Sequence, residues 1–581
     1  MPEQSININE SVRLFFRRAL DSERLSTPSL ELFRHFFARL FDSEFVSSPG
    51  QLKVILGGVI GILASLGGIL AQVYYHKYLV LHQLDSPDPY RRALLADILF
   101  LETLVMVILG LFTAIQWSAL YPTLRDYLAL AALPIRMRQI FVAKFASLTA
   151  LAGGVLLTIT AAPSFILPAV IKGHYEQGTV FHIPALFVSA TLAGLFVFFS
   201  LIAMQGIVLN LTPVRHFGKV SLTVQGLIVA SLVGGLPFVL SIPNLYPYMD
   251  LRPAWVMWAP PAWFVAIHQT MMGVRDPITS ELARRAWIGS ASSVIAAVAA
   301  YWWSYKSHRR RVLESPGGEG SGSAVWLETL QERLVPQPRH LAAFSFIAKT
   351  LRRSQQHRLI LTGFASLALA LIVEGFLGAS QGTRSGFRAP SVAIPLALSL
   401  FLLAGLRYLF RLPVELRANW VFRIGSEGHG AELLRGAEAF LYCTALAPLA
   451  LMSAAVEIAL LGPSMGLAAA ILTSLASLIL VELVLFSFQR IPFTSSYLPG
   501  RRPLVDVLIG YLLASVVYVS VLASLIASCA ESAVRTTALA AVLLAAWYGL
   551  RYARRTSYEI HRLEFEELPE TIVETLSIEK D

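Results

Sequence analysis

Carboxylic acids within apolar stretches are the residues of this sequence that could do chemistry. Glu374, Glu457 and Glu482 each lie among mostly apolar residues, and Glu482 has two aliphatic residues on either side. Because a charge is costly in lipid, such a group normally faces protein or water. It can relay a proton or an ion or line a substrate path, or it can tie neighbouring helices together as a protonated or hydrogen-bonded carboxyl. The sequence leaves both roles open; Glu102, Glu457 and Asp506 lie nearer the ends of their stretches, which favours the structural role.

The sequence contains no motif that predicts a catalytic or metal-binding site. Two matches to the hydrolase pattern G-x-S-x-G, Gly378–Gly382 and Gly462–Gly466, stand at the ends of helix hairpins, whereas the pattern requires a strand–turn–helix context. The sequence contains no phosphate-binding G-x-x-x-x-G-K-[ST] loop. Its 12 histidines have no metal-binding spacing, and its 2 cysteines are too few for a disulfide framework. We therefore expect no enzyme activity, no metal and no cofactor bound to this chain.

The elements that position the carboxyls are long stretches without any charged residue. A membrane-spanning helix needs about 20 mostly apolar residues, and lipid offers the backbone no partners, so these stretches must be helical. We predict an all-α, polytopic membrane protein with about twelve transmembrane helices. They lie at roughly 54–75, 97–117, 145–171, 184–209, 220–242, 286–305, 359–377, 392–409, 437–460, 466–488, 504–527 and 536–550.

Composition and charge agree with a protein embedded in the lipid bilayer. The 581 residues are 55% hydrophobic and 14% charged, whereas a soluble chain is about 25% charged. The net charge of +10 gathers at helix ends and in alternate loops, which indicates the positive-inside pattern and not a nucleic-acid partner. The loops after the second, eighth and tenth predicted helices are rich in arginine. Both termini are therefore predicted to be cytoplasmic, with the chain in a plasma membrane such as a bacterial inner membrane.

A polar segment divides the chain into two halves. Residues 307–357 contain three consecutive arginines and a Gly/Ser-rich run typical of a flexible linker. In each half the second helix is followed by a basic, partly apolar loop, and an even number of helices makes the repeat parallel. We predict two six-helix halves related by a parallel pseudo-repeat. The expected parts are a cytoplasmic amphipathic segment 1–53, a first transmembrane half 54–306, the linker 307–357, a second half 358–551 and an acidic cytoplasmic tail 552–581.

An amphipathic helix is predicted before the first membrane helix. Leu30, Phe33, Phe37, Leu40 and Phe41 fall on one helical face. Such a helix lies either in the cytoplasmic membrane interface or against the protein's own cytoplasmic face. The pattern does not distinguish the two.

The most specific local pattern is the loop after the second predicted helix. Its apolar residues would form one face of a short helix at the cytoplasmic surface, its basic residues would face headgroups or a partner, and its proline would end it before the third membrane helix. The pattern reads Asp126-x-x-x-Leu130-x-x-Leu133-Pro134-Ile135, followed by Arg136, Arg138, Ile140 and Lys144.

This segment resembles the permease subunits of type-2 ABC exporters. In that family a D-x-x-x-L-x-x-L-P-I segment leads into an I-x-x-A-K start of the third span, which Ile140-Phe-Val-Ala143-Lys144 fits. The resemblance implies that the loop docks on a separate cytoplasmic ABC ATPase subunit, which binds and hydrolyses the ATP, and transmits its closure to the helices. The coupling residues implied are Asp126, Leu130, Leu133, Pro134, Arg136, Arg138 and Lys144.

The second half departs from this family pattern. Its equivalent loop, with Glu415, Arg417, Trp420 and Arg423, occupies the same place without matching the motif, so its coupling role rests on order alone. Members of the family usually have six spans and pair as dimers, so about twelve spans imply a fused pair; a homodimer of the chain is also left open.

Two other functions fit the same features. A secondary transporter could be driven by protons carried on Glu482 or Glu374. A membrane scaffold or a membrane-embedded transferase would need no transport path. The substrate class is not encoded in any motif of the chain.

Overall fold

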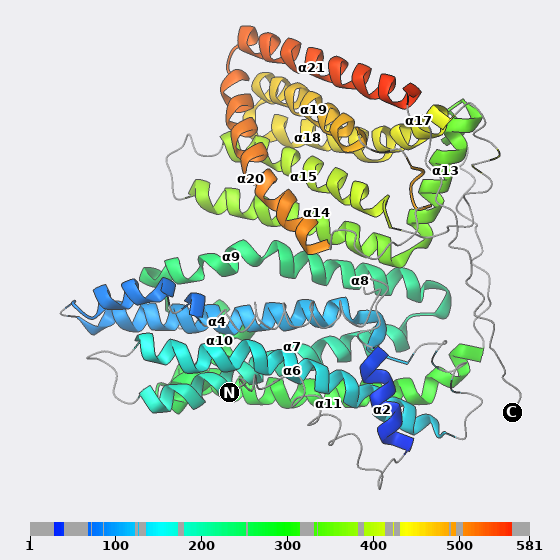
Figure 1. Ribbon diagram of the computed structural model, residues 1–581. Helices are drawn as coiled ribbons and strands as arrows, with labels where there is room; N and C mark the ends of the chain where they lie inside the picture. The colour runs from blue at the N-terminus through cyan, green and yellow to red at the C-terminus, as the bar shows by residue number, and fades with distance from the viewer. Residues whose placement is uncertain are drawn as a thin grey trace, which may run out of the picture. The chain divides into compact units, whose positions relative to one another are not determined.

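The computed structural model describes most of the chain between residues 28 and 560 (Figure 1). Outside the described residues lie the two ends and 40–67, 71, 85, 123–125, 127–129, 131–134, 172–178, 251–253, 314–330, 334, 381–387, 413–421, 423, 425–429, 487, 489 and 495–503. Every regular element among the described residues is a helix, which confirms the predicted all-α class.

Eight helices in the described part of the chain are long and apolar enough to cross a membrane. They coincide with the second, third, fourth, fifth, eighth, ninth, tenth and twelfth predicted membrane helices, and they indicate a multi-pass membrane protein. The number becomes nine if the bent pair Pro338–Arg353 and His357–Val373 forms a single span. The eight are Pro87–Ile115, Arg138–Ile171, Val180–Leu211, His216–Pro247, Ser391–Leu409, Glu432–Leu461, Pro463–Leu485 and Ala533–Tyr558.

The predicted count of twelve is therefore matched only in part. Most of the first predicted helix, 54–75, lies outside the described residues. The sixth lies within α11 (Pro277–Leu313), one unbroken helix whose Ser, Gly, Trp and Tyr residues keep it out of the apolar set. The eleventh lies within α20 (Leu504–Cys529), where only Val517–Cys529 stands out as a shorter apolar helix.

The chain divides into two compact units that do not follow the order of the sequence. Unit 1 consists of Met1–Phe217 and Tyr246–Ser315, and unit 2 of Gly218–Leu245 and Pro316–Asp581. The later boundary falls within the predicted linker 307–357. The earlier exchange was not predicted: the fifth membrane helix belongs with the second unit, not with the half of the sequence in which it stands.

Unit 1 is built around α7 (Thr179–Leu211), which contacts α4 (Pro87–Ile115), α6 (Met137–Ile171) and α11 (Figure 1). The short 3-10 turns η1 (Trp117–Ala119) and η3 (Ala254–Trp258) belong to this unit, and η2 (Ile242–Tyr248) spans the boundary at which the chain returns to it from unit 2. Helix α10 (Pro260–Met271) has 12 residues, too few to cross a bilayer, yet Phe264 and Val265 are fully buried. It forms an apolar core with α4, α7 and α11.

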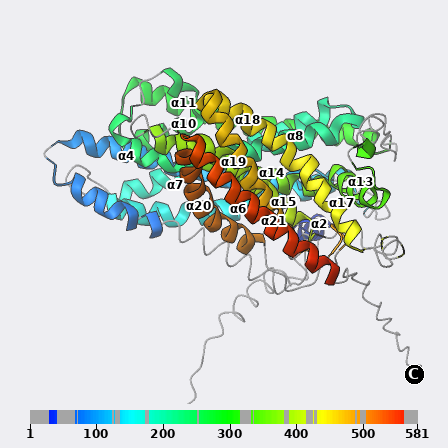
Figure 2. The same cartoon turned by 90° about the horizontal axis from the view of Figure 1, so that it is seen from above.

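Unit 2 is built around α15 (Arg388–Leu409), which contacts α14 (Gln355–Ser380), α18 (Ala447–Leu461), α19 (Pro463–Leu485) and α20. Helices α18, α19 and α21 (Ala533–Ile560) run side by side, as Figure 2 shows. Before α18, the chain passes from α17 (Gly430–Phe440) through a π-helical turn, Leu441–Leu446. Helix α13 (Pro338–Arg353) packs on α17.

Small residues explain how the exchanged segment joins unit 2. Helix α8 (Val214–Gly234) continues into the short α9 (Leu236–Ser241), which contacts α14. A Cβ atom at Gly226 would lie 3.5 Å from Thr362 of α14, and one at Gly234 would lie 2.6 Å from Cδ2 of Leu369. The absence of a Cβ atom at Gly234 therefore leaves room for the Leu369 side chain, whereas a Cβ atom at Gly226 would make an ordinary van der Waals contact.

The predicted amphipathic helix exists as α2 (Pro28–Arg39) and packs against α6. Its most buried residues are Leu32 and Phe36, at 4% and 2% exposure, which contact Ile140 and Ala143. Leu30 of the predicted apolar stripe is exposed, so the stripe was misplaced at its start. Of the two positions considered from the sequence, the structure shows the one against the protein's own surface.

Candidate functional site

A buried ion pair holds the predicted coupling loop to the start of α6. Nζ of Lys144 donates to Oδ2 of Asp126 at 2.7 Å, and the two side chains are 7% and 2% exposed. The same ammonium lies 5.3 Å from the ring centroid of Phe36 in α2. A buried charge is tolerated only when it is paired, so this pair fixes the loop against α6 and α2.

The loop is further ordered where it enters α6. The backbone N–H of Arg136 donates to Oε1 of Gln139 at 3.0 Å, and the backbone N–H of Gln139 donates back to the Arg136 carbonyl at 2.8 Å. This pairing satisfies free amides at the first turn, as in a capping box. Arg136 and Arg138 are both exposed at this end of the helix. The site thus combines a segment held in place by the Asp126–Lys144 pair with two exposed cations, Arg136 and Arg138.

The structure covers only some of the predicted coupling residues. Leu130 is partly buried and packs with α2 and the start of α6. Leu133 and Pro134 lie outside the described residues. So do the second-half residues Glu415, Arg417, Trp420 and Arg423.

Glu482 is part of a second buried charge cluster, in unit 2. Oε2 accepts from Nε of Arg554 at 2.6 Å, and Oε1 accepts from the Tyr442 hydroxyl at 2.7 Å. Arg554 also pairs with Glu438 at 2.9 Å, and both Glu482 and Arg554 are fully buried. Glu482 lies three residues before the end of α19, not at its centre. The contacts are those of a carboxyl that ties α17, α19 and α21 together.

Glu102 and Glu457 differ from Glu482 because their described contacts are with hydroxyl groups and include no cation. Thr473 donates to Oε1 of Glu457 at 2.9 Å, and Oε2 has no hydrogen-bond partner. Ser189 likewise donates to Oε1 of Glu102, whose Oε2 has no partner. Glu374 is helical within α14, and its side chain is outside the description.

Glu102 is the buried carboxyl whose position the sequence misjudged. It stands 15 residues after the first residue of α4 and 13 before the last, and it is fully buried. The helix starts at Pro87, ten residues before the predicted start at residue 97, because Ser86 accepts a hydrogen bond from the Asp88 amide and proline fits the first turn. The Ser86-Pro87 pair, read as a helix start, would have predicted a longer helix with Glu102 near its middle.

Other buried polar pairs in unit 1 had no sequence signal. Lys77 donates to Asp97 at 2.7 Å, and the Tyr78 hydroxyl donates to the same carboxylate at 2.7 Å. Nδ1 of His182 and Nε2 of His268 lie 3.3 Å apart, and both rings are buried. These partners lie on different helices, which no local spacing reveals. Among the described residues no three His, Cys, Asp or Glu side chains are grouped so that they could hold a metal ion.

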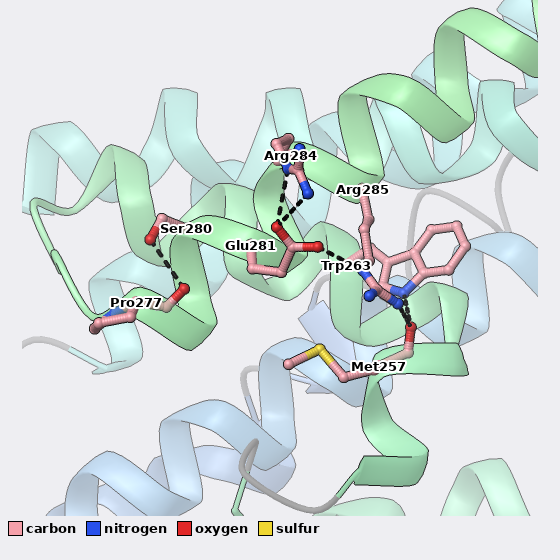
Figure 3. A network of polar contacts seen from close by, with 7 residues as sticks. All are labelled: Met257, Trp263, Pro277, Ser280, Glu281, Arg284 and Arg285. Carbon is pink, nitrogen blue, oxygen red and sulfur yellow. Dashed lines mark hydrogen bonds and ion pairs between the residues drawn. The ribbon is translucent and has the colours of Figure 1, made fainter.

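A polar cluster marks the start of α11 (Figure 3). The Glu281 carboxylate lies between two guanidinium groups: Arg284 Nη2 is 2.8 Å from Oε2, and Arg285 Nε is 3.0 Å from Oε1. Arg285 and the Trp263 indole both donate to the Met257 carbonyl, at 3.0 and 2.9 Å. The hydrogen bonds from Arg285 and then Arg284 hold the pKa of Glu281 below its usual range. The carboxylate is therefore charged at neutral pH.

Comparison of the chain with protein-family models, with curated proteins and with solved structures finds no match.

Proposed function

We propose that this chain is the membrane-spanning permease component of an ABC exporter, moving an unidentified substrate while a separate cytoplasmic ATPase hydrolyses ATP. The observation that supports this function most is the buried Asp126–Lys144 pair at 2.7 Å, which links the segment before α6 to that helix, with Arg136 and Arg138 exposed at the helix start. Exposed arginines on a loop that is held in place offer a binding surface for a soluble partner. A loop that served only as a topology anchor would not need a buried ionic link to the next helix.

The proposed mechanism uses α6 as a lever. Closure of the ATPase would displace the loop, and the ion pair would pass that displacement to α6, which is 35 residues long. Pro163 and Pro168 remove backbone donors within the same helix, which gives it places to bend. The helix would then open and close a path across the membrane.

The full architecture proposed is twelve membrane helices in two six-helix halves with both termini cytoplasmic. The second-half loop would serve as the second docking point, and the halves would stand in for the two subunits of a dimeric exporter. Continuity of α11 through residues 286–305 supports the sixth span of this architecture.

Co-purification tests this function. Charge reversal at Arg136 and Arg138 is expected to leave expression and folding nearly intact, because both residues are exposed, and to release the ATPase. A matched double reversal at Arg91 and Arg275, exposed on the predicted outer side, should not release it. If every cytoplasmic protein that co-purifies with the wild type stays bound after reversal at Arg136 and Arg138, the exporter proposal is wrong.

Proton-coupled transport is the second candidate, and Glu102 is the observation that favours it. A neutral carboxyl in an apolar core has one oxygen free to exchange a proton, and Oε2 of Glu102 has no partner. This candidate requires substrate movement that follows the proton gradient in vesicles containing only this chain. Movement that needs a nucleotide and a partner protein would exclude it.

A further inference from the structure

The exposed face of α11 has the composition of a helix that faces lipid from one interface to the other. Between Arg285 and Lys306 lie 20 residues without a charge, which at 1.5 Å per residue rise by about 30 Å, the thickness of the hydrocarbon core. Ile288, Ile295 and Val298 are 58%, 68% and 53% exposed within this stretch. Exposed tryptophans stand at both of its ends: Trp287 at one, and Trp302 and Trp303 at the other. Tryptophan is enriched at both membrane interfaces, so these residues mark where the bilayer begins and ends.

The cluster of Glu281, Arg284 and Arg285 therefore lies at headgroup level. Arg284 stands two residues before the uncharged stretch, and its side chain is 68% exposed. One carboxylate shared by two guanidinium groups leaves an excess of one positive charge. On the preceding turn Arg275 and Asp276 balance each other formally, and Asp276 is engaged in capping α11 through the Ile278 amide at 3.2 Å.

The contacts within the cluster orient the two arginines differently. Arg285 is held by Glu281, by the Met257 carbonyl and by the Trp258 ring, whose centroid is 5.8 Å from the guanidinium carbon. Arg284 contacts only one oxygen of Glu281 in the geometry described, and the rest of its guanidinium group is exposed. Trp258 is 79% and Trp287 is 56% exposed beside these arginines. The site presents donors for an anion together with uncovered indole surface.

We propose that Arg284, supported by Glu281 and Arg285 and flanked by Trp258 and Trp287, binds the phosphate of a phospholipid headgroup at the end of α11 opposite the linker. Guanidinium groups match phosphate oxygens geometrically. A lipid explains both parts of the site, because its phosphate meets the arginine and its glycerol and acyl groups cover the indoles. A free phosphate ion would leave the two tryptophans exposed to water.

Photocrosslinking of lipid to the full-length chain tests the site. The chain is placed in phosphatidylcholine nanodiscs that contain a phosphatidylglycerol with a photoreactive headgroup, and adducts on residues 254–288 are quantified by mass spectrometry. Phosphatidylglycerol keeps a net negative charge, so it should label this region more strongly than a photoreactive phosphatidylcholine at the same mole fraction. Arg284→Gln should lower the yield about five-fold, the equivalent of ~1 kcal/mol for one basic residue at a membrane surface. Arg284→Lys should retain most of the labelling.

Arg275→Gln is the matched control, because it removes the same charge from an exposed arginine in the loop just before α11. Its labelling should equal that of the wild type. An equal loss in Arg275→Gln and Arg284→Gln would overturn the specific site in favour of diffuse attraction. Unchanged labelling in Arg284→Gln would overturn it outright, and suppression of labelling by excess inorganic phosphate would reassign it to a free anion. Because Arg284 is mostly exposed, folding of its variants is expected to be normal, and the thermal unfolding midpoint verifies this.

Discussion

Arg554 and Glu482 form an ion pair of 2.6 Å in which neither side chain is exposed to solvent. Arg554 comes from the last part of α21 and Glu482 from the last turn of α19. The pair therefore joins two helices through residues that are 72 positions apart in the sequence. Oε2 of Glu438 in α17 lies 2.9 Å from Nη2 of the same guanidinium group and forms an ion pair with it. Arg554 thus lies between two carboxylates, and Arg551, 3.4 Å from Glu438, brings the second positive charge to the cluster.

Loss of Arg554 is expected to destabilise unit 2 severely. Arg554→Met leaves Glu482 buried without its cation and Glu438 with only Arg551, and breaking a buried pair in this way costs about 3–5 kcal/mol. Arg551→Met is the control, because Arg551 is 27% exposed and lies 3.4 Å from Glu438, and such partly exposed pairs contribute about 1 kcal/mol or less. The measurement is the thermal unfolding midpoint of the purified chain in detergent. Similar small shifts for both variants would show that the cluster does not hold the helices together.

A double-mutant cycle at Asp126 and Lys144 is expected to show strong coupling. Lys144→Met removes the cation beside the buried Asp126 carboxylate and should cost about 3 kcal/mol, whereas the double variant with Asp126→Asn removes both charges and should recover most of that loss. Unfolding midpoints of the four proteins give the coupling energy. Additive effects of the two substitutions would mean that the pair does not anchor the loop to α6.

Surface labelling of single cysteines is expected to show both termini and the linker in the cytoplasm. In a background without Cys443 and Cys529, an impermeant maleimide applied from outside should miss cysteines placed at Ser321 and Ser577. It should reach one placed at Gly178, since the alternation of basic loops puts that residue outside. External labelling at Ser321 would contradict the topology. Permeabilised cells provide the control that each cysteine is reactive.

Glu102→Gln is expected to leave stability within about 1 kcal/mol of the wild type, because an isolated carboxyl in an apolar core is far less costly when neutral and glutamine keeps its shape. Reconstituted transport separates the two candidate functions. An ATP-driven exporter should keep its rate in this variant, whereas a proton-coupled carrier that uses Glu102 should lose transport. Glu102→Asp, which can still carry a proton, should restore transport in the second case only.

Acidification is expected to open the Glu281 cluster at a pH below the ordinary glutamate pKa of 4.5. The folded-state pKa is lowered by the hydrogen bonds from Arg285 and Arg284. The stabilisation is therefore complete above the unfolded-state pKa and is lost as the pH falls through the lower folded-state pKa. Subtracting the fluorescence of Trp258→Phe from that of the wild type gives the emission of Trp258 alone. A change in this emission with pH reports the release of Arg285 from the Trp258 ring. Glu281→Gln should show no such transition, and a wild-type midpoint above 4.5 would contradict the sign of the shift.

Helix class and most membrane segments could be predicted from the sequence because charge-free stretches of about 20 residues allow few alternatives. α11 shows the limit of that reasoning. Its residues 286–305 carry no charge, but Ser, Gly, Trp and Tyr reduce its hydropathy, so a purely apolar criterion misses a helix that the lack of charge identifies. The start of α4 is set by the Ser86-Pro87 cap. This cap lies before the apolar stretch, so the apolar pattern alone did not predict it.

Tertiary pairing could not be predicted in the same way. The motif that ends in Lys144 singled out both members of the Asp126–Lys144 pair, 18 positions apart, but gave no indication that they contact each other. Glu482 was recognised as an intramembrane acid, whereas Arg554 was placed beyond the last membrane helix at 536–550. The helix α21 continues to Ile560 and brings it back against α19. A long-range partner depends on where helices end and how they pack, and neither is written in the local spacing.

During translation, the exchanged segment Gly218–Leu245 is made before the helices that it packs against. Gly218–Leu245 leaves the ribosome before any other part of unit 2, since the remainder of that unit begins 71 residues later at Pro316. At ~5–20 residues per second this is a wait of about 4–14 s. During that time Gly226 and Gly234 have neither Thr362 nor Leu369 to pack against. A nascent chain released at the linker would contain all of unit 1 together with one helical segment of unit 2 whose native neighbours were never translated.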